Sequence, residues 1–209
     1  MATKQISGLY AITPDESNTE ELLRKVRLAL QGGARVLQYR NKIAGTELKL
    51  TQAQALSDLC KEFKVTYLVN DDAHLALQVN ADGVHLGNDD GSVSLARSVL
   101  GENKIIGVSC YNELRLAYEA VRQGADYIAF GAFFVSNSKP AAKKAEIKLL
   151  SAARMQLDVP IVAIGGITQI NGGALINAGA DSLAVISALW NAPDIQTSAQ
   201  EFSTLFSRV

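Results

Sequence analysis

The feature that most constrains the fold is the alternation of short apolar runs with longer stretches of helical periodicity along the chain. Most of the short runs are continuously apolar, so both faces of each predicted strand should be covered. The predicted strands span residues 7–13, 35–40, 66–70, 83–86, 104–109, 127–131, 160–165 and 182–186. Parallel strands buried on both faces are typical of α/β proteins, in which helices connect the strands.

The segments between the strands predict helices that return tightly to the sheet. Residues 19–31 and 45–63 have apolar residues at helical spacing. Four similar segments, GGARVLQ, NADGVHL, GADYIAF and GADSLAV, place Gly or Asn before a strand, where either residue can end a helix in the left-handed conformation. Eight such units predict a single (β/α)8 TIM barrel over residues 1–209. A doubly wound open sheet is the alternative, although no GxGxxG motif follows the first strand.

The charge balance and the cysteines restrict the function classes. The chain has 20 Lys and Arg against 21 Asp and Glu, so it lacks the basic excess of a nucleic-acid-binding protein. Cys60 and Cys110 are too few for a disulfide framework, and no apolar run reaches the roughly 18 residues of a membrane helix. We therefore expect a soluble cytoplasmic protein without nucleic-acid or membrane partners, in which local clusters of cations bind any anionic ligand.

Cations gather where the second predicted strand ends. Gln38, Arg40 and Lys42 occupy alternate positions and would share one side if the extended conformation continued. Active sites of barrels form at the carboxyl ends of the strands, so these side chains would face the mouth of the barrel. A solvated rim with ordinary surface cations is the alternative explanation.

Acidic and amide residues follow the next two strands, at 70–72 and 88–90. Their oxygens suit Mg2+, which binds one or two carboxylates and completes its shell with water and phosphate. Helix capping is the alternative, because Asp and Asn are favoured before the first turn of a helix. Capping does not explain why the acids gather beside Arg40 and Lys42.

Further candidates lie at the ends of the later strands. Ser109 could bind a phosphate or cap the following helix. Residues 163–167 and 185–187 follow the seventh and eighth strands, where barrels commonly bind phosphate through backbone N–H groups. The connection 131–146 is long for a βα loop and has the composition of an active-site lid.

The two histidines, His74 and His85, are predicted to be structural rather than acids or bases. No Ser-His-Asp or Cys-His arrangement is apparent, so covalent catalysis has no visible nucleophile. Two anion sites and one site for a hard cation indicate two phosphorylated small-molecule substrates.

Several motifs in this order resemble the thiamine phosphate synthase family. They span residues 9–187 and comprise LYAIT, QYRNK, LVNDD, ADGVHLGNDD, IIGVS, GADYIAFGAFFVSNSK, AIGGIT and GADSLAVIS. The resemblance implies a (β/α)8 transferase that joins the diphosphate ester of 4-amino-5-hydroxymethyl-2-methylpyrimidine to a thiazole phosphate. Thiamine phosphate and pyrophosphate would be the products, and the resemblance also allows a homo-oligomer.

The resemblance also assigns roles to individual residues. The pyrimidine diphosphate would be bound by Gln38, Tyr39, Arg40, Asn41, Lys42, Asn70, Ser109 and Lys139. Mg2+ would be held by Asp71 and Asp90, and the thiazole phosphate by Ser136, Asn137, Ser138, Gly166, Ile186 and Ser187. Arg40, Ser109 and Lys139 would be the catalytic residues, because they act on the charge or the ring of the reacting pyrimidine.

The chain departs from the family pattern after Ser109, where Cys110 and Tyr111 stand in a region that often carries a histidine. One alternative function is that of a metal-independent thiazole tautomerase, which is expected to use a histidine base. Another phosphosugar barrel enzyme and a non-enzymatic, ligand-sensing relative are further alternatives. The sequence shows no histidine near Ser109 but has both candidate metal ligands, which favours the synthase.

Overall fold

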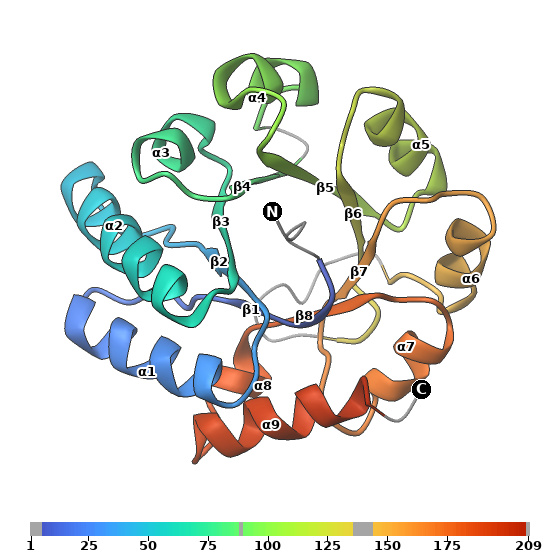
Figure 1. The fold of residues 1–209 in the computed structure, drawn as a ribbon. Coiled ribbons are helices and arrows are strands. Elements are labelled where there is room, and N and C mark those ends of the chain that lie inside the picture. The colour runs from blue at the N-terminus through green and yellow to red at the C-terminus, as the bar shows by residue number, and fades with distance from the viewer. Residues whose placement is uncertain (1–5, 88–89, 136–143, 208–209) are drawn as a thin grey trace.

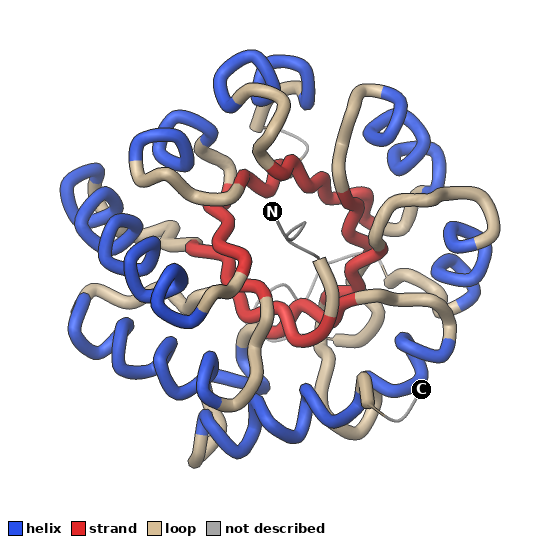
Figure 2. The backbone as a smooth tube through the Cα atoms, viewed as in Figure 1, coloured by secondary structure: helices blue, strands red, loops and turns tan. Residues whose placement is uncertain are grey.

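The computed structural model describes residues 6–87, 90–135 and 144–207. Its strands form a closed, all-parallel barrel in which each strand pairs with the next and β8 pairs with β1 (Figures 1 and 2). The strands are β1 (Gly8–Ile12), β2 (Val36–Tyr39), β3 (Thr66–Asn70), β4 (Gly83–Leu86), β5 (Ile105–Tyr111), β6 (Tyr127–Phe130), β7 (Ile161–Ile164) and β8 (Ser182–Val185). The predicted (β/α)8 barrel is confirmed, and the open sheet is wrong.

Helices surround the barrel on the outside, as Figure 2 shows. They are α1 (Thr19–Gln31), α2 (Thr46–Phe63), α3 (Ala73–Gln78), α4 (Val93–Leu100), α5 (Leu114–Arg122), α6 (Lys148–Arg154), α7 (Gly172–Asn177), α8 (Ser187–Trp190) and α9 (Ile195–Leu205). The amphipathic patterns predicted α1 and α2 closely. After β8 the chain forms α8 and then α9, which packs against α1 and closes the helical layer (Figure 1).

Side chains of the strands are buried on both sides of the barrel wall. One apolar cluster fills the space between the strands and the helices, and a second, smaller one fills the barrel interior. Tyr10, Val36, Leu68, Tyr127 and Val162 belong to the interior cluster. This arrangement explains why the strands read as continuous apolar runs.

The repeated segments form the predicted helix-to-strand returns. Gly33, Asn80, Gly124 and Gly179 all have positive φ angles, of 97°, 49°, 94° and 109°. Each lies between a helix and the strand that follows it, and the left-handed conformation lets the chain reverse within a few residues. The prediction for these four segments is confirmed.

The aspartates in three of these segments have a role that the sequence pattern did not reveal. Asp82, Asp126 and Asp181 each accept a backbone N–H bond from the first part of a neighbouring strand. The donors are Tyr67 at 2.8 Å, Ile106 at 2.7 Å and Ile161 at 2.7 Å. Each carboxylate thus fixes the start of one strand against the loop that leads into another.

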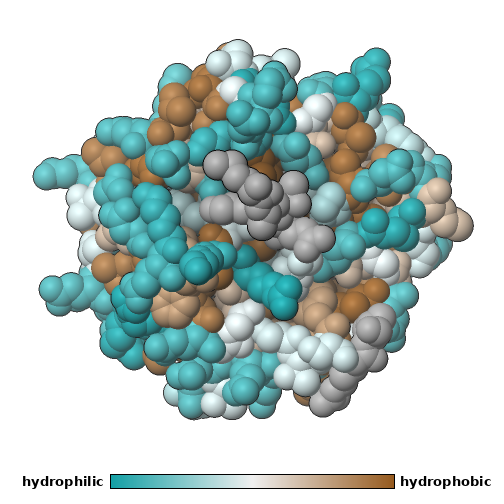
Figure 3. Space-filling view, viewed as in Figure 1, coloured by the Kyte–Doolittle hydropathy of each residue, from teal (hydrophilic) through white to brown (hydrophobic). Residues whose placement is uncertain are grey.

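Figure 3 shows one end of the barrel, where hydrophilic side chains cover much of the surface and hydrophobic side chains form smaller patches between them. Among the described residues, none of the helices combines the length and the apolar character that a bilayer crossing requires.

We predict that Gly124→Ala and Gly173→Ala change stability in opposite directions. A Cβ atom at either position meets no atom within 4 Å, but only Gly124 has a positive φ angle. Alanine in the left-handed region costs about 1–2 kcal/mol, whereas alanine in a helix is favoured over glycine by up to about 1 kcal/mol. Urea unfolding should show a lower free energy of unfolding for Gly124→Ala and an unchanged or higher one for Gly173→Ala. Equal losses in both would contradict this explanation.

Candidate active site

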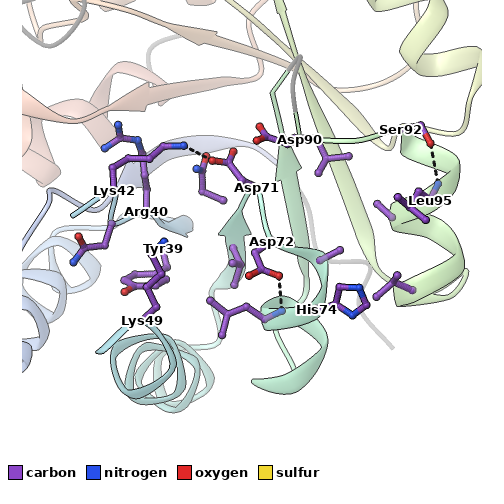
Figure 4. A pocket seen from close by; sticks show the side chains of 18 residues that line it. Tyr39, Arg40, Lys42, Lys49, Asp71, Asp72, His74, Asp90, Ser92 and Leu95 are labelled. Carbon is purple, nitrogen blue, oxygen red and sulfur yellow. Dashed lines mark hydrogen bonds and ion pairs between the residues drawn. The ribbon is translucent and has the colours of Figure 1, made fainter. Parts of the chain in front are cut away.

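A cavity of about 410 Å³ lies at the carboxyl ends of β2, β3 and β4, between these strands and α2, α3 and α4 (Figure 4). The predicted residues that border it are Tyr39, Arg40, Asn41, Lys42, Asn70, Asp71 and Asp90. Side chains far apart in the sequence therefore meet at one rim of the barrel. Lys49 of α2 also borders the cavity and adds a cation that the sequence did not single out.

Residues that follow β1 bind the backbone of the two predicted cations, Arg40 and Lys42. β2 ends at Tyr39, and Thr13 Oγ1 then accepts the Arg40 backbone N–H and donates to the Arg40 carbonyl, both at 2.8 Å. Asp15 Oδ1 accepts the backbone N–H of Lys42 at 2.7 Å and lies 3.3 Å from Arg40 Nη1. Asp15 was not predicted, because only the pairing of β1 with β2 brings it beside these cations.

Asp71 has a backbone conformation that few non-glycine residues adopt. Its φ angle is 67°, and its N–H donates to the carbonyl of His85 at 2.8 Å, which fixes the turn after β3. The Asp71 carboxylate accepts a hydrogen bond from the Lys42 ammonium (Figure 4). Ion pairs as exposed as this one contribute little to stability, so the contact does not explain why Asp71 adopts the left-handed conformation.

Asp90 lies next to Asp71 and forms an acidic pair with it (Figure 4). Its Oδ2 atom accepts the N–H of Gly87 at 2.8 Å. Partial burial, followed by the hydrogen bond with Asp71, raises the pKa of Asp90 above its usual range. A divalent cation between the two carboxylates would favour their charged forms.

The donor set suits Mg2+ better than zinc. Within the described ranges, no three His, Cys, Asp or Glu side chains are close enough together to hold a metal ion. Two carboxylates with room for water and phosphate are the ligands that Mg2+ typically takes, whereas structural zinc needs four protein ligands. The residues present therefore fit the predicted ion.

Helix capping explains some of the acidic residues but not Asp71. Asp72 is the N-cap of α3 and accepts the Leu75 N–H at 2.9 Å, and Ser92 does the same for α4 with Leu95 at 3.1 Å. Asp71 and Asp90 therefore do not cap α3 or α4. Residues 88 and 89 lie outside the described part of the chain.

Tyr39 and Asn41 are buried, and their side chains bond to the layer of helices. Tyr39 Oη donates to Gln52 Oε1 at 2.9 Å, and Asn41 Nδ2 donates to the same atom at 3.0 Å and to the Glu16 carbonyl at 2.8 Å. These contacts hold the loop after β2 in place. A direct contact of either residue with the pyrimidine diphosphate stays a prediction.

Gln38 and Ser109 lie on the barrel interior rather than around the cavity. Gln38 is buried and donates from Nε2 to Tyr10 Oη at 2.7 Å, while Ser109 Oγ lies 2.9 Å from His85 Nε2. No histidine lies near Ser109 in the sequence, but the fold places the imidazole of His85 beside its hydroxyl. Parallel pairing of β4 with β5 brings together two residues that are 24 positions apart.

The two histidines differ in their surroundings. Both ring nitrogens of His85 are hydrogen-bonded, and burial lowers its pKa to about 4, so it is neutral at physiological pH. That agrees with the structural role predicted for His85. His74 was expected to be structural too, but it is exposed at the edge of the cavity.

Cys110 is buried, whereas Tyr111 is exposed. Cys110 packs in the cluster between strands and helices, and burial raises the pKa of its thiol to about 12. Tyr111 is exposed and follows an irregularity in the pairing of β5 with β6. The Cys110 thiol therefore keeps its proton at neutral pH.

The residues predicted for the thiazole phosphate lie at a different part of the rim. Gly166, Ile186 and Ser187 follow β7 and β8, which pair with each other. A Cβ atom on Gly166 would lie 2.4 Å from the carbonyl oxygen of Val135, so glycine is needed for this close approach. Ser136, Asn137, Ser138 and Lys139 come directly after Val135 and lie outside the described residues.

Comparisons with known proteins identify the family. Residues 9–189 match the family described as thiamine monophosphate synthase. The chain belongs to this family. It is 54% identical over 203 residues to the thiamine-phosphate synthase of Methylobacillus flagellatus, covering 97% of this chain and 96% of that one. A thiamine-phosphate synthase of Nitrosospira multiformis is 52% identical, with 98% and 88% covered.

Solved structures agree with this assignment to the thiamine monophosphate synthase family. A thiamine phosphate pyrophosphorylase from Pyrococcus furiosus has 34% identity and a TM-score of 0.87, and 96% of each chain is covered. The orotidine 5'-phosphate decarboxylase from Pyrococcus horikoshii, at 15% identity and a TM-score of 0.70, shares the fold alone. The chain is thus an enzyme of the synthase family, and the non-enzymatic alternative is wrong.

We predict that Asp71→Gly and Asp72→Ala have opposite effects on stability. Glycine at 71 relieves the left-handed strain and removes one of two adjacent carboxylates, so the free energy of unfolding should rise by up to about 1 kcal/mol. Alanine at 72 removes the N-cap of α3 and should lower the free energy of unfolding by about 1 kcal/mol. Urea unfolding at neutral pH measures both. A loss of stability in Asp71→Gly comparable to that in Asp72→Ala would show that Asp71 is primarily structural.

Proposed function

We propose that the enzyme condenses 4-amino-2-methyl-5-(diphosphooxymethyl)pyrimidine with 4-methyl-5-(2-phosphooxyethyl)thiazole in a Mg2+-dependent substitution. Thiamine phosphate and pyrophosphate are the products. The observation that carries the proposal is the meeting of Asp71, Asp90, Lys42 and Arg40 at one rim of a family member's barrel. Such a site suits a leaving group with several negative charges.

The metal would be held by Asp71 and Asp90, with Lys42 beside them. When bound, Mg2+ would neutralise charge that grows on the departing diphosphate. The Lys42 ammonium donates a hydrogen bond to the Asp71 carboxylate. Lys42 is therefore in place to move its hydrogen bond from this carboxylate to a diphosphate oxygen.

Arg40 and Lys42 would bind the diphosphate directly. Their backbone is held by Thr13 and Asp15, so both cations start from a fixed loop. Fixed charges that match those of the transition state need little reorganisation as the C–O bond breaks. Lys139 is predicted to add a further cation from the long loop.

The pyrimidine itself makes a protein nucleophile unnecessary. Its amino group donates electron density to the ring, so the methylene carbon can bear positive charge once pyrophosphate leaves. Gln38 and Ser109 would hold the ring, and the thiazole nitrogen would then attack the methylene carbon. The high pKa of the Cys110 thiol agrees with a reaction without covalent catalysis.

The thiazole phosphate would be received at the ends of β7 and β8. Gly166 and the backbone around Ile186 and Ser187 offer the kind of N–H cradle at which barrels bind phosphate. Ser136, Asn137 and Ser138 are predicted to complete the site. Binding of this second phosphate across the barrel mouth would orient the thiazole nitrogen toward the pyrimidine.

We predict that pyrophosphate release requires both phosphorylated substrates and Mg2+. Each of the two anion sites and the acidic pair supplies one part of the reaction, so omission of any component should abolish turnover. A coupled assay of pyrophosphate, run with and without chelator, measures this. Undiminished release of pyrophosphate in the presence of chelator would rule out the metal-dependent substitution, and no release under any condition would leave tautomerase chemistry as the alternative.

We predict that Asp71→Asn and Asp72→Asn separate the metal ligand from the helix cap. Asn caps a helix about as well as Asp, so Asp72→Asn should keep both stability and turnover. Asp71→Asn removes a charged ligand and should lower kcat on the order of 10²-fold, with little change in unfolding. Steady-state kinetics and thermal unfolding of both variants provide the comparison. Equal kcat values for the two would exclude Asp71 from the metal site.

A further inference from the structure

A chain of hydrogen bonds crosses the barrel interior from the end of β2 to the end of β5. It includes three side chains for which the proposed reaction has no role. The successive contacts are Gln38 Nε2 to Tyr10 Oη at 2.7 Å, Tyr10 Oη to Tyr127 Oη at 2.9 Å, Tyr127 Oη to His85 Nδ1 at 2.8 Å and His85 Nε2 to Ser109 Oγ at 2.9 Å. The chain therefore connects the two residues that are predicted to hold the pyrimidine.

The barrel interior is built around Tyr127. A Cβ atom on Gly107 would lie 1.9 Å from Tyr127 Cζ, so only glycine leaves room for the phenol at this place. The Tyr127 ring stacks on His85 with centroids 5.5 Å apart, and it meets the edge of Tyr10 at 6.3 Å. These contacts allow the phenol very little freedom to turn its hydroxyl elsewhere.

The direction of the chain follows from its Gln38 end. An amide nitrogen only donates, so Tyr10 accepts from Gln38, and in the described contacts the Tyr127 oxygen is the partner left for the proton of Tyr10. Tyr127 then gives its proton to His85 Nδ1. A neutral imidazole has one N–H, which must be on Nε2, and this donates to Ser109. The hydroxyl proton of Ser109 is left for a ligand.

The protonation states agree with this direction. Burial raises the pKa values of Tyr10 and Tyr127 far above neutrality, so both phenols keep their protons. Burial also lowers the pKa of His85 to about 4, which leaves the imidazole with a single proton at pH 7. Each hydroxyl along the chain thus has one proton to donate.

We propose that Tyr10, Tyr127 and His85 are positioning residues that fix the Ser109 hydroxyl as a hydrogen-bond donor toward a ring nitrogen of the aminopyrimidine. This inference rests on the proposed function for the identity of the ligand. Ring nitrogens of an aminopyrimidine only accept hydrogen bonds, whereas a 4-oxo analogue carries an N–H at one of them. Where Ser109 faces the nitrogen that carries the N–H in the analogue, its hydroxyl proton favours the amino compound, because the analogue would place two donors against each other.

Nitrogen-15 NMR of the imidazoles tests the direction in the enzyme without substrate. The protein has only two histidines, so the variant His74→Gln assigns the signals of His74 and His85. We expect His85 at pH 7 to be the tautomer with the proton on Nε2. A proton on Nδ1 would mean that the chain runs the other way, with Ser109 donating to His85, and would overturn the proposal.

Gln38→Glu should reverse the chain from its far end. A carboxylate only accepts, so Tyr10 must donate to it, and the reversal passes through Tyr127 to move the imidazole proton to Nδ1. The carbon-13 signal of the introduced carboxylate gives the pH at which this group titrates. The His85 tautomer is then measured above that pH. Gln52→Glu is the matched control, because Gln52 is also buried and bonded to a tyrosine but lies outside the chain. An unchanged His85 tautomer in Gln38→Glu would contradict the proposed coupling.

Kinetics of Tyr127→Phe test the positioning role. Loss of one phenol hydroxyl leaves His85 without its donor, so KM for the pyrimidine diphosphate should rise about tenfold and KM for the thiazole phosphate should not change. Equal KM values for wild type and variant would refute the positioning role. A wild-type enzyme with the expected His85 tautomer but without turnover would refute the proposed reaction. Normal turnover with His85 protonated on Nδ1 would refute only the proposed direction of the hydrogen bonds.

Discussion

Closure of the barrel by the pairing of β8 with β1 is the constraint on which the rest of the structure depends. Residues more than 170 positions apart meet there, and Ser182 Oγ donates to the Gly8 carbonyl at 2.8 Å. Because the strands are all parallel, closure brings their carboxyl ends to one rim. The acidic pair, the loop after β2 and the ends of β7 and β8 face the same space only for this reason. Trp190 of α8 reinforces the closure by donating to the Ile12 carbonyl at 2.6 Å.

At a few positions of the rim, the backbone conformation or the charge of a residue lowers the stability of the fold. Asp71 has a left-handed backbone and stands beside a second carboxylate, and each of these features costs free energy in the absence of a bound cation. Asp72, one residue later, adopts an ordinary capping geometry and stabilises α3. Neighbouring aspartates of the same motif therefore differ in their effect on stability, and residue type alone does not distinguish them. Backbone conformation does.

The sequence predicted features that depend on local patterns and missed those that depend on contacts across strands. Helix α1 was predicted at its observed bounds, since its apolar spacing is regular and Asn18 caps its first turn. The left-handed returns at Gly124 and Gly179 were predicted because few residues other than glycine suit them. The contacts of Asp15 with the loop after β2, and of His85 with Ser109, were not predicted. Both arise from the register of neighbouring strands, which no local pattern encodes.

The polar side chains of the barrel interior are joined by hydrogen bonds into one layer at the end of an apolar core. Below this level the interior is filled by apolar side chains such as Val36 and Leu68, which need no partners. Gln38 is buried and Ser109 is partly buried, so their polar atoms need hydrogen-bond partners within the protein. Among the described residues, no buried side-chain nitrogen or oxygen lacks a hydrogen-bond partner. Phenol and imidazole groups meet this requirement without charge, and because each link accepts one proton and passes on another, the orientation of one end determines that of the other.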